Sequence, residues 1–274
     1  MTDTHFELQR RRPQRTAVQG TAIAVVSTVA VFATGFLLIV NSGGWPKVHQ
    51  AFFNGKRFAD SFGEIWAKFG QNVRIFLLCE LGILVLGLTL ALLRTSKSPA
   101  LFPFRAFTVI FTDLMRGVPL PLMILLFGFG IPGLGLSRPW NSGIIWGAVA
   151  MVLVYSAYVA EVFRAGIESI HPSQLAAARG LGLSRSQGLR YVVVPQAVRR
   201  VIPPLLNDFI GLQKDTAQLQ ALGFIEALRA AQIASSRGFN FTPYFGAALL
   251  FILITVPQAR IVDWMIARER NRQR

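Results

Sequence analysis

Charged side chains interrupt several apolar runs of this chain. Asp113 and Arg116 stand three residues apart, as do Glu161 and Arg164, so each pair shares one face of a helix and can form an ion pair. Charges inside apolar segments are energetically costly and mark functional sites by default. For Glu161 and Arg164 we expect a structural ion pair, whereas Asp113 and Arg116 could equally hold helices together or line a pathway.

Two groups of polar residues accompany these charges. They are Tyr155, Ser156 and Tyr158, a turn or two before Glu161, and Lys214, Asp215 and Thr216, which end a later apolar run. Lys214, Asp215 and Thr216 could be a structural or interfacial charge cluster, or they could line a pathway, since an acid beside a base offers a solute both an acceptor and a donor. We expect them, and the three residues before Glu161, to line a pathway for a small polar solute.

Metal, disulfide and phosphate chemistry have no residues to carry them. The histidines His5, His49 and His171 lie far apart, and the single cysteine, Cys79, lies inside an apolar run, so the sequence offers no metal cluster and no disulfide. It also contains no G-x-x-x-x-G-K-[ST] phosphate loop. We therefore predict that the chain is not an enzyme and holds no metal or cofactor.

The elements that must position these residues are membrane helices. Of the 274 residues, 53% are hydrophobic and 15% are charged, and the mean hydropathy is +0.47, whereas soluble domains carry nearer 25% charge. Several runs approach the roughly 20 apolar residues that cross a hydrocarbon core, and their lack of alternation excludes a barrel. We predict an all-α polytopic bundle with about six transmembrane helices: Thr21–Val40, Val73–Leu93, Phe107–Phe129, Ile144–Val162, Val201–Leu212 and Tyr244–Ile266.

The formal net charge of +15 indicates membrane topology rather than nucleic-acid binding, because Lys and Arg collect on cytoplasmic loops. With six spans, eighteen basic residues fall on the side that holds both termini and eight fall on the other. Both termini are therefore predicted in the cytoplasm. The parts in order are a basic cytoplasmic N-terminus (1–20), an anchor helix (21–40), an external loop (41–72), a core (73–268) and a cytoplasmic tail (269–274).

The segment His171–Ala197 breaks the apolar texture between two spans. Pro172 suits the first turn of a helix, the residues 174–179 are mostly strong helix formers, and Gly180 and Gly182 can end it. The pattern predicts two to three turns of helix on the cytoplasmic side. Such a helix is either a docking element for a partner or a plain loop helix that covers the ends of the spans.

Here the sequence begins to resemble a family. "QLAAARGLGLSRSQGLRYVVVPQA" (Gln174–Ala197) is similar to the signature loop of ATP-binding-cassette (ABC) importer permeases, with an alanine pair, a glycine and a later Val-Pro. "TDLMRGVPLPLMILLFGFG", "SAYVAEVFRAGIESI" and "NDFIGLQKDTAQL" resemble the polar amino acid branch, which carries histidine, glutamine, glutamate, arginine or cystine. The resemblance covers about Val73 to Arg268 and implies a five-helix type I importer core, preceded by the anchor helix.

The resemblance also implies roles for single residues. It adds Asn207 to the pathway and assigns coupling to an ATPase to Gln174, Ala176, Ala177, Ala178, Arg179, Gly182, Ser184 and Pro195. Ala176 stands where the family has its signature glutamate, which leaves open whether a sister permease supplies that acid.

The implied mechanism is alternating access in the bacterial cytoplasmic (inner) membrane, driven by ATPases that dock on residues 171–184. The implied partners are an ABC ATPase dimer that holds ATP and Mg, a second permease that is identical or homologous, an extracytoplasmic amino-acid-binding protein and membrane lipid, with no nucleic acid.

Three other function classes compete with this one. An ion-coupled secondary transporter would show inverted repeats and interrupted helices, and no repeat is visible in the sequence. A membrane-bound enzyme would need clustered catalytic groups at the interface, which the sequence lacks. A membrane scaffold that transports nothing is not excluded by composition.

Overall fold

The computed structural model describes residues 3–96 and 98–272, and the side chains of residues 20–96 and 98–268. These residues form helices joined by short turns, and they contain no strand, which confirms the all-α prediction. The chain divides into two compact units, Met1–Asn54 and Gly55–Arg274. The second unit thus begins well before residue 73, where the sequence placed the start of the core.

The first unit consists of α1 (Asp3–Val40) and α2 (Trp45–Phe52). The stretch Gly20–Val40 is apolar, long enough to cross a membrane and free of buried residues, as expected of an anchor helix surrounded by lipid. The predicted basic segment 1–20 belongs to the same helix from residue 3 onward, and its side chains up to residue 19 lie outside the described residues. The predicted tail 269–274 is helical up to Arg272, and its side chains also lie outside them.

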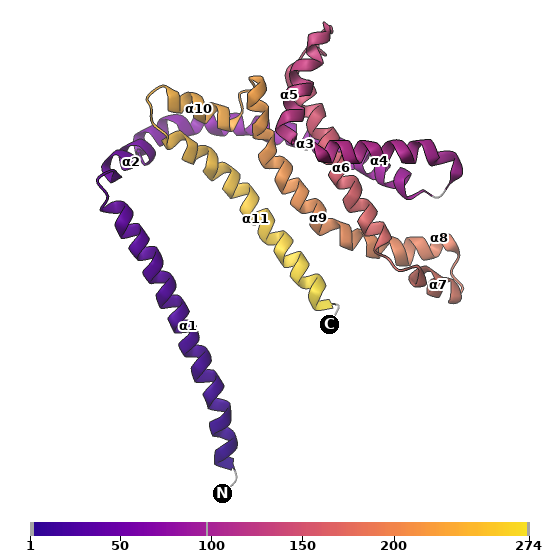
Figure 1. Cartoon of the computed structure of the whole chain (residues 1–274), viewed down its shortest axis with the longest axis horizontal. Helices are drawn as coiled ribbons and strands as arrows, with labels where there is room; N and C mark the ends of the chain where they lie inside the picture. Colours follow the sequence, from indigo (N-terminus) through magenta and orange to yellow (C-terminus); the bar gives the residue numbers. More distant parts are fainter. Residues whose placement is uncertain (1–2, 97, 273–274) are drawn as a thin grey trace. The chain divides into compact units, whose positions relative to one another are not determined.

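The second unit holds the other helices (Figure 1). In chain order they are α3 (Gly55–Thr95), η1 (Pro99–Leu101), α4 (Phe102–Gly117), α5 (Leu120–Gly130), η2 (Pro132–Leu134), α6 (Gly143–Glu168), α7 (Pro172–Gly180), α8 (Arg185–Gly188), the π-helical turn η3 (Leu189–Val193), α9 (Val194–Asp215), η4 (Thr216–Leu222), α10 (Ala227–Ser236) and α11 (Thr242–Arg272). Helix α6 leads from the α5 end of this unit to α7, and α3 packs across it (Figure 1).

The helix bounds correct one sequence prediction. Residues 41–72 are not a loop, because α2 and the first part of α3 occupy most of them; the stretch after Gly55 has no proline to stop a helix before Thr95. Among the described residues, four helices pass as membrane spans by length and apolarity, or five if one bent pair is a single span. The remaining predicted span, Val201–Leu212, lies within α9.

The bent pair is the predicted span Phe107–Phe129. It is two helices, α4 and α5, whose axes differ by 105°. The break falls at Val118 and Pro119, which both have extended backbone dihedrals. Proline disfavours the helical conformation in the residue before it and cannot donate a backbone hydrogen bond, so the sequence itself ends α4 here.

Helix α9 replaces the short predicted span Val201–Leu212. It runs from Val194 to Asp215 with Pro203 and Pro204 inside it. It does not qualify as a span by apolarity, because it carries charged residues at Arg199, Arg200, Asp208, Lys214 and Asp215. Its 22 residues nevertheless reach about 33 Å, the thickness of a hydrocarbon core.

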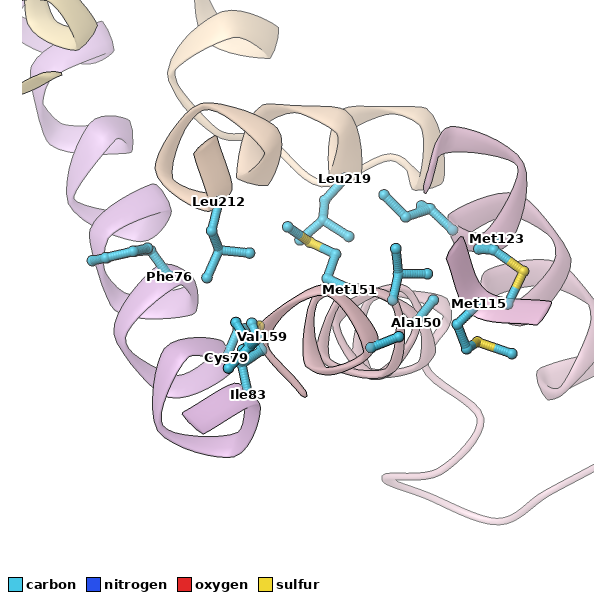
Figure 2. Close-up of a cluster of buried hydrophobic side chains, with 13 residues drawn as sticks. Phe76, Cys79, Ile83, Met115, Met123, Ala150, Met151, Val159, Leu212 and Leu219 are labelled. Atoms are coloured by element: carbon cyan, nitrogen blue, oxygen red, sulfur yellow. The ribbon is translucent and has the colours of Figure 1, made fainter. Parts of the chain in front are cut away.

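Apolar side chains from α3, α4, α5, α6, α9 and η4 form the main core of the second unit (Figure 2). Figure 2 shows Phe76, Cys79 and Ile83 reaching inward from α3 towards side chains of α6. Gly87 permits the close approach of these two helices, because a Cβ there would lie 2.6 Å from a methyl group of Val159. A second cluster around Ile65 and Leu250 joins α3 to α10 and α11.

Candidate functional site

A cavity of about 450 Å³ opens between the α4–α5 elbow, α6 and α9. Its polar lining consists of Arg116, Tyr155, Tyr158, Asp208 and Asp215. Four of these were predicted as pathway residues, so the structure brings together groups that are up to 99 positions apart in the sequence. A volume of this size suits a small ligand, and the lining carries charges of both signs.

Tyr155 and Asp215 form one wall of this cavity. The Tyr155 hydroxyl donates a hydrogen bond of 2.7 Å to Asp215 Oδ2, and Gln218 Nε2 donates one of 2.9 Å to Asp215 Oδ1. The carboxylate is thereby fixed by one donor from α6 and one from η4. Both oxygens retain further acceptor capacity for a ligand.

Arg116 and Tyr158 supply the basic part of the lining. The Arg116 guanidinium lies 5.6 Å from the centroid of the Tyr158 ring, and the Tyr158 hydroxyl donates a 3.4 Å hydrogen bond to the Arg116 carbonyl oxygen. The nearest carboxylate to Arg116 is that of Glu161, at 3.9 Å. Arg116 is therefore only loosely paired and can still meet an anionic group.

Asp208 was missed at the sequence level. Its Oδ2 atom is buried and has no hydrogen-bond partner among the described residues, although Asp208 lines the cavity. A buried polar atom without a partner is costly unless a ligand or water satisfies it. The signal was present, since an acid in the middle of a predicted span marks a functional site by default.

The other predicted pathway residues lie elsewhere. Asp113, Ser156, Asn207, Lys214 and Thr216 do not line this cavity. Asp113, Asn207 and Lys214 are exposed. Ser156 is fully buried, and its hydroxyl has no partner in the described part of the chain. No ion pair joins Asp113 to Arg116 in that part either, because Arg116 turns towards Glu161 and Tyr158.

Glu161 is the centre of an ion-pair network below the cavity. Arg164 Nη2 lies 2.8 Å from Glu161 Oε2, and Arg94 of α3 pairs with Glu161 Oε1. Arg94 also donates a 3.1 Å hydrogen bond to Thr112 Oγ1. Because the carboxylate is only 16% exposed and contacts several cations, it ties α3 and α4 to α6.

Thr216 belongs to a different buried junction. Asn72 of α3 donates hydrogen bonds of 3.1 Å both to Thr216 Oγ1 and to Glu226 Oε2, and its own amide oxygen accepts from Ala227 N. Glu226 caps α10 through the backbone amides of Leu228 and Arg229. Burial raises the pKa of the Glu226 carboxyl above its ordinary value, although these donors oppose the shift.

The predicted docking helix is present as α7. The ring nitrogen of His171 caps its start by accepting from Ser173 N at 3.2 Å, and Gly182 follows its end with a φ of 86°, a left-handed conformation that glycine adopts without steric cost. Gln174, Ala176, Ala177 and Arg179 are exposed along it. Ala178, by contrast, is only 3% exposed, so it seats the helix rather than touching a partner.

Several contacts brace α7 against the rest of the loop. A Cβ on Gly188 of α8 would lie 2.7 Å from Leu175 and 3.4 Å from Ala178, so α8 packs tightly on the inner face of α7. Ser184 starts α8 with a reciprocal capping box to Gln187. Pro195 occupies the first turn of α9, and Arg200 donates to the Ser169 carbonyl at the end of α6. The loop is thus a compact unit attached to α6 and α9.

Within the described residues, no group of three or more His, Cys, Asp or Glu side chains could hold a metal ion.

Comparison with known proteins places this architecture. The model of the family described as "Binding-protein-dependent transport system inner membrane component" matches residues 83–271. The probable glutamine ABC transporter permease proteins GlnM and GlnP of Bacillus subtilis are each 30% identical to this chain, over 76% and 77% of it and over 94% and 89% of their own lengths.

Solved structures agree. A chain from the crystal structure of an amino acid ABC transporter with histidines has a TM-score of 0.65 and 28% identity, covering 74% of this chain and 93% of that one. The inward-facing MetNI methionine ABC transporter shares the fold, with a TM-score of 0.56 at 16% identity over 73% of this chain and 95% of that one. With the family model matching more than half of its length, this membrane-spanning chain belongs to the inner membrane components of binding-protein-dependent transport systems, the permease subunits of ABC importers.

Proposed function

We propose that this permease carries polar amino acids of the glutamate, glutamine, histidine, arginine and cystine class, and that separate ATPases drive it by docking on α7. The observation that carries the proposal is the construction of the loop: an exposed helix, seated on α8 through Ala178, between two helices that line the cavity. A push on α7 is transmitted to α6 and α9, because Arg200 joins their ends.

The cavity suits an amino acid zwitterion. Arg116 supplies a cation for the α-carboxylate, and Asp208 supplies an unsatisfied carboxylate oxygen for the α-ammonium group. Asp215 is held at a fixed position by Tyr155 and Gln218 and can accept a further donor. The relatives named for glutamine and the transporter solved with histidines support this substrate class.

The complex that follows has ATP and Mg on an ABC ATPase dimer, a second permease subunit, identical or homologous, and an extracytoplasmic amino-acid-binding protein. It sits in the bacterial cytoplasmic membrane with both termini in the cytoplasm. This topology requires α9 to be the sixth crossing. Its length of 22 residues supports that role, and its two acids, Asp208 and Asp215, then face the cavity rather than lipid.

The test is uptake of labelled glutamine, histidine, arginine and glutamate into vesicles that contain the chain with its ATPase, sister permease and binding protein. We expect uptake to stop when the ATPase is omitted and to survive collapse of the ion gradients. An ion-coupled secondary transporter gives the opposite result, and a scaffold gives no uptake that depends on this chain.

A further inference from the structure

A second cavity, of about 500 Å³, lies near the end of α6 that leads into α7. It opens between the end of α3, the start of α4 and α6. Three arginines from three different helices line it: Arg94, Arg105 and Arg164. Glu168 is the only acid in its lining. Nothing in the transport mechanism proposed above uses this cavity.

The charges around the cavity do not balance. Arg94 and Arg164 pair with Glu161, and Arg164 also pairs with Glu168. Arg105 has no carboxylate within ion-pair distance among the described residues; its Nη1 donates to the Ser96 carbonyl at 3.2 Å, and its guanidinium lies 5.3 Å from the Phe102 ring centroid. Three cations against two carboxylates leave one positive charge in excess, and it is held in place at Arg105.

The rest of the lining is apolar and continues onto a face that proteins in water rarely expose. Ala106, Val109 and Ile110 complete the wall that α4 contributes. On the same helix Ile110 is 67% exposed, and beyond the cavity Phe107 and Leu114 are 61% and 57% exposed. A small soluble anion would make no contact with this apolar surface, whereas an amphiphile with a charged headgroup would contact both the arginines and the apolar side chains.

We propose that this cavity binds the headgroup of an anionic phospholipid, with the phosphate on Arg105 and the acyl chains along the exposed apolar side of α4. Basic pockets between membrane helices on the cytoplasmic side suit such headgroups, because that leaflet meets the positively charged loops. The location of this face in the inner leaflet rests on the proposed topology; the binding itself does not depend on transport.

The experiment measures lipid binding to the full-length chain, purified in a neutral detergent, by native mass spectrometry with phosphatidylglycerol and with phosphatidylcholine. Arg105→Gln removes the unpaired charge. Arg199→Gln, on an exposed arginine of α9 that does not line the cavity, removes the same charge elsewhere. We expect saturable binding of phosphatidylglycerol to the wild type and to Arg199→Gln, and about fivefold weaker binding to Arg105→Gln. Arg105→Lys keeps the charge and should bind more tightly than Arg105→Gln.

Several outcomes overturn the proposal. If Arg105→Gln and Arg199→Gln weaken phosphatidylglycerol binding equally, the effect comes from net charge and not from this cavity. If phosphatidylcholine binds as tightly as phosphatidylglycerol, the site does not recognise the charge of the headgroup. Displacement of the lipid by inorganic phosphate at the same concentration means an anion site that ignores the acyl chains. The chain has one cysteine, so a variant with Cys79→Ser and Ile110→Cys carries a single cysteine on this face of α4. Efficient disulfide cross-linking between two copies of this variant in lipid nanodiscs would mean that a second copy of the chain, rather than lipid, covers this face.

Discussion

Tyr155 on α6 donates a 2.7 Å hydrogen bond to the carboxylate of Asp215, the last residue of α9. This bond joins the two helices that emerge from the docking loop, at the cavity rather than at the loop. It therefore couples the positions of α6 and α9 at the cavity. Removing the hydroxyl oxygen of Tyr155 breaks this hydrogen bond.

We expect Tyr155→Phe to raise the KM for uptake about tenfold or more, the value of one hydrogen bond to a charged acceptor, because Asp215 keeps only its contact with Gln218. The measurement is the KM for uptake in reconstituted vesicles. Tyr191→Phe is the matched control, since Tyr191 is 63% exposed on η3, away from the cavity. An unchanged KM in Tyr155→Phe would mean that the hydrogen bond between Tyr155 and Asp215 does not contribute to substrate binding.

Asp208→Asn should raise the KM for every amino acid substrate about tenfold or more, because the α-ammonium group loses a charged partner. Membrane insertion and the melting temperature should be unchanged or improved, because the variant removes a buried charge that has no partner. Asp263→Asn, on the exposed end of α11, is the control for charge. Loss of uptake through misfolding would show as reduced protein in the membrane.

Gly182→Val should uncouple ATP hydrolysis from uptake. Its φ of 86° costs a side-chain-bearing residue about 1–2 kcal/mol, so the turn after α7 will shift. Gly182→Asn should retain more coupling, since asparagine tolerates this conformation. Gly180→Val is the companion control, because that position has equally open space but no positive φ. Equal coupling in all three proteins would mean that the turn does not position the docking helix.

Glu161→Gln should destabilise the chain by about 2 kcal/mol, seen as a lower melting temperature in detergent. It leaves Arg94 and Arg164 without their shared carboxylate in a half-buried setting. Glu168→Gln should cost much less, because Glu168 is 55% exposed and pairs with Arg164 alone. The reverse order of the two effects would contradict the network described here.

The Asn72–Glu226 junction predicts a pH dependence. The folded chain raises the pKa of Glu226 above the ordinary 4.5, so the folded state binds this proton more tightly than the unfolded state does. Its contribution to stability is then largest below pH 4.5 and falls as the pH rises through the folded-state pKa. Melting temperatures measured from pH 4 to pH 8 should show a smaller decline in Glu226→Gln than in the wild type.

Sequence reasoning identified much of this architecture, because long apolar runs and glycine–proline punctuation are local signals. Such signals predicted the helix at Pro172–Gly180 to within a residue or two. Local signals did not predict the contacts of residues whose partners lie on a helix far away in the sequence. Thr216 follows a charged pair in the sequence, yet it faces Asn72 of a helix 144 positions away, and no local pattern encodes that partner.

The same limit explains the cavity. The sequence named Arg116, Tyr155, Tyr158 and Asp215, but the elbow at Val118–Pro119 and the unbroken course of α9 through two prolines decide which of the candidates meet. Asp208 lies inside the predicted span Val201–Leu212, and only the packing of α9 against its neighbours shows that it lines the cavity. Hydropathy alone undervalues a helix that exposes few of its residues to lipid.

The unbroken length of α3 has a mechanical consequence. Its 41 residues make a rod of about 60 Å, twice the depth of the oily layer it crosses. If such a rod tilts about its middle, each degree of tilt moves either end by about half an ångström. Small readjustments where α3 packs on α6 are therefore enlarged at its Gly55 end, and they carry α10 and α11, which pack on that end, along with them.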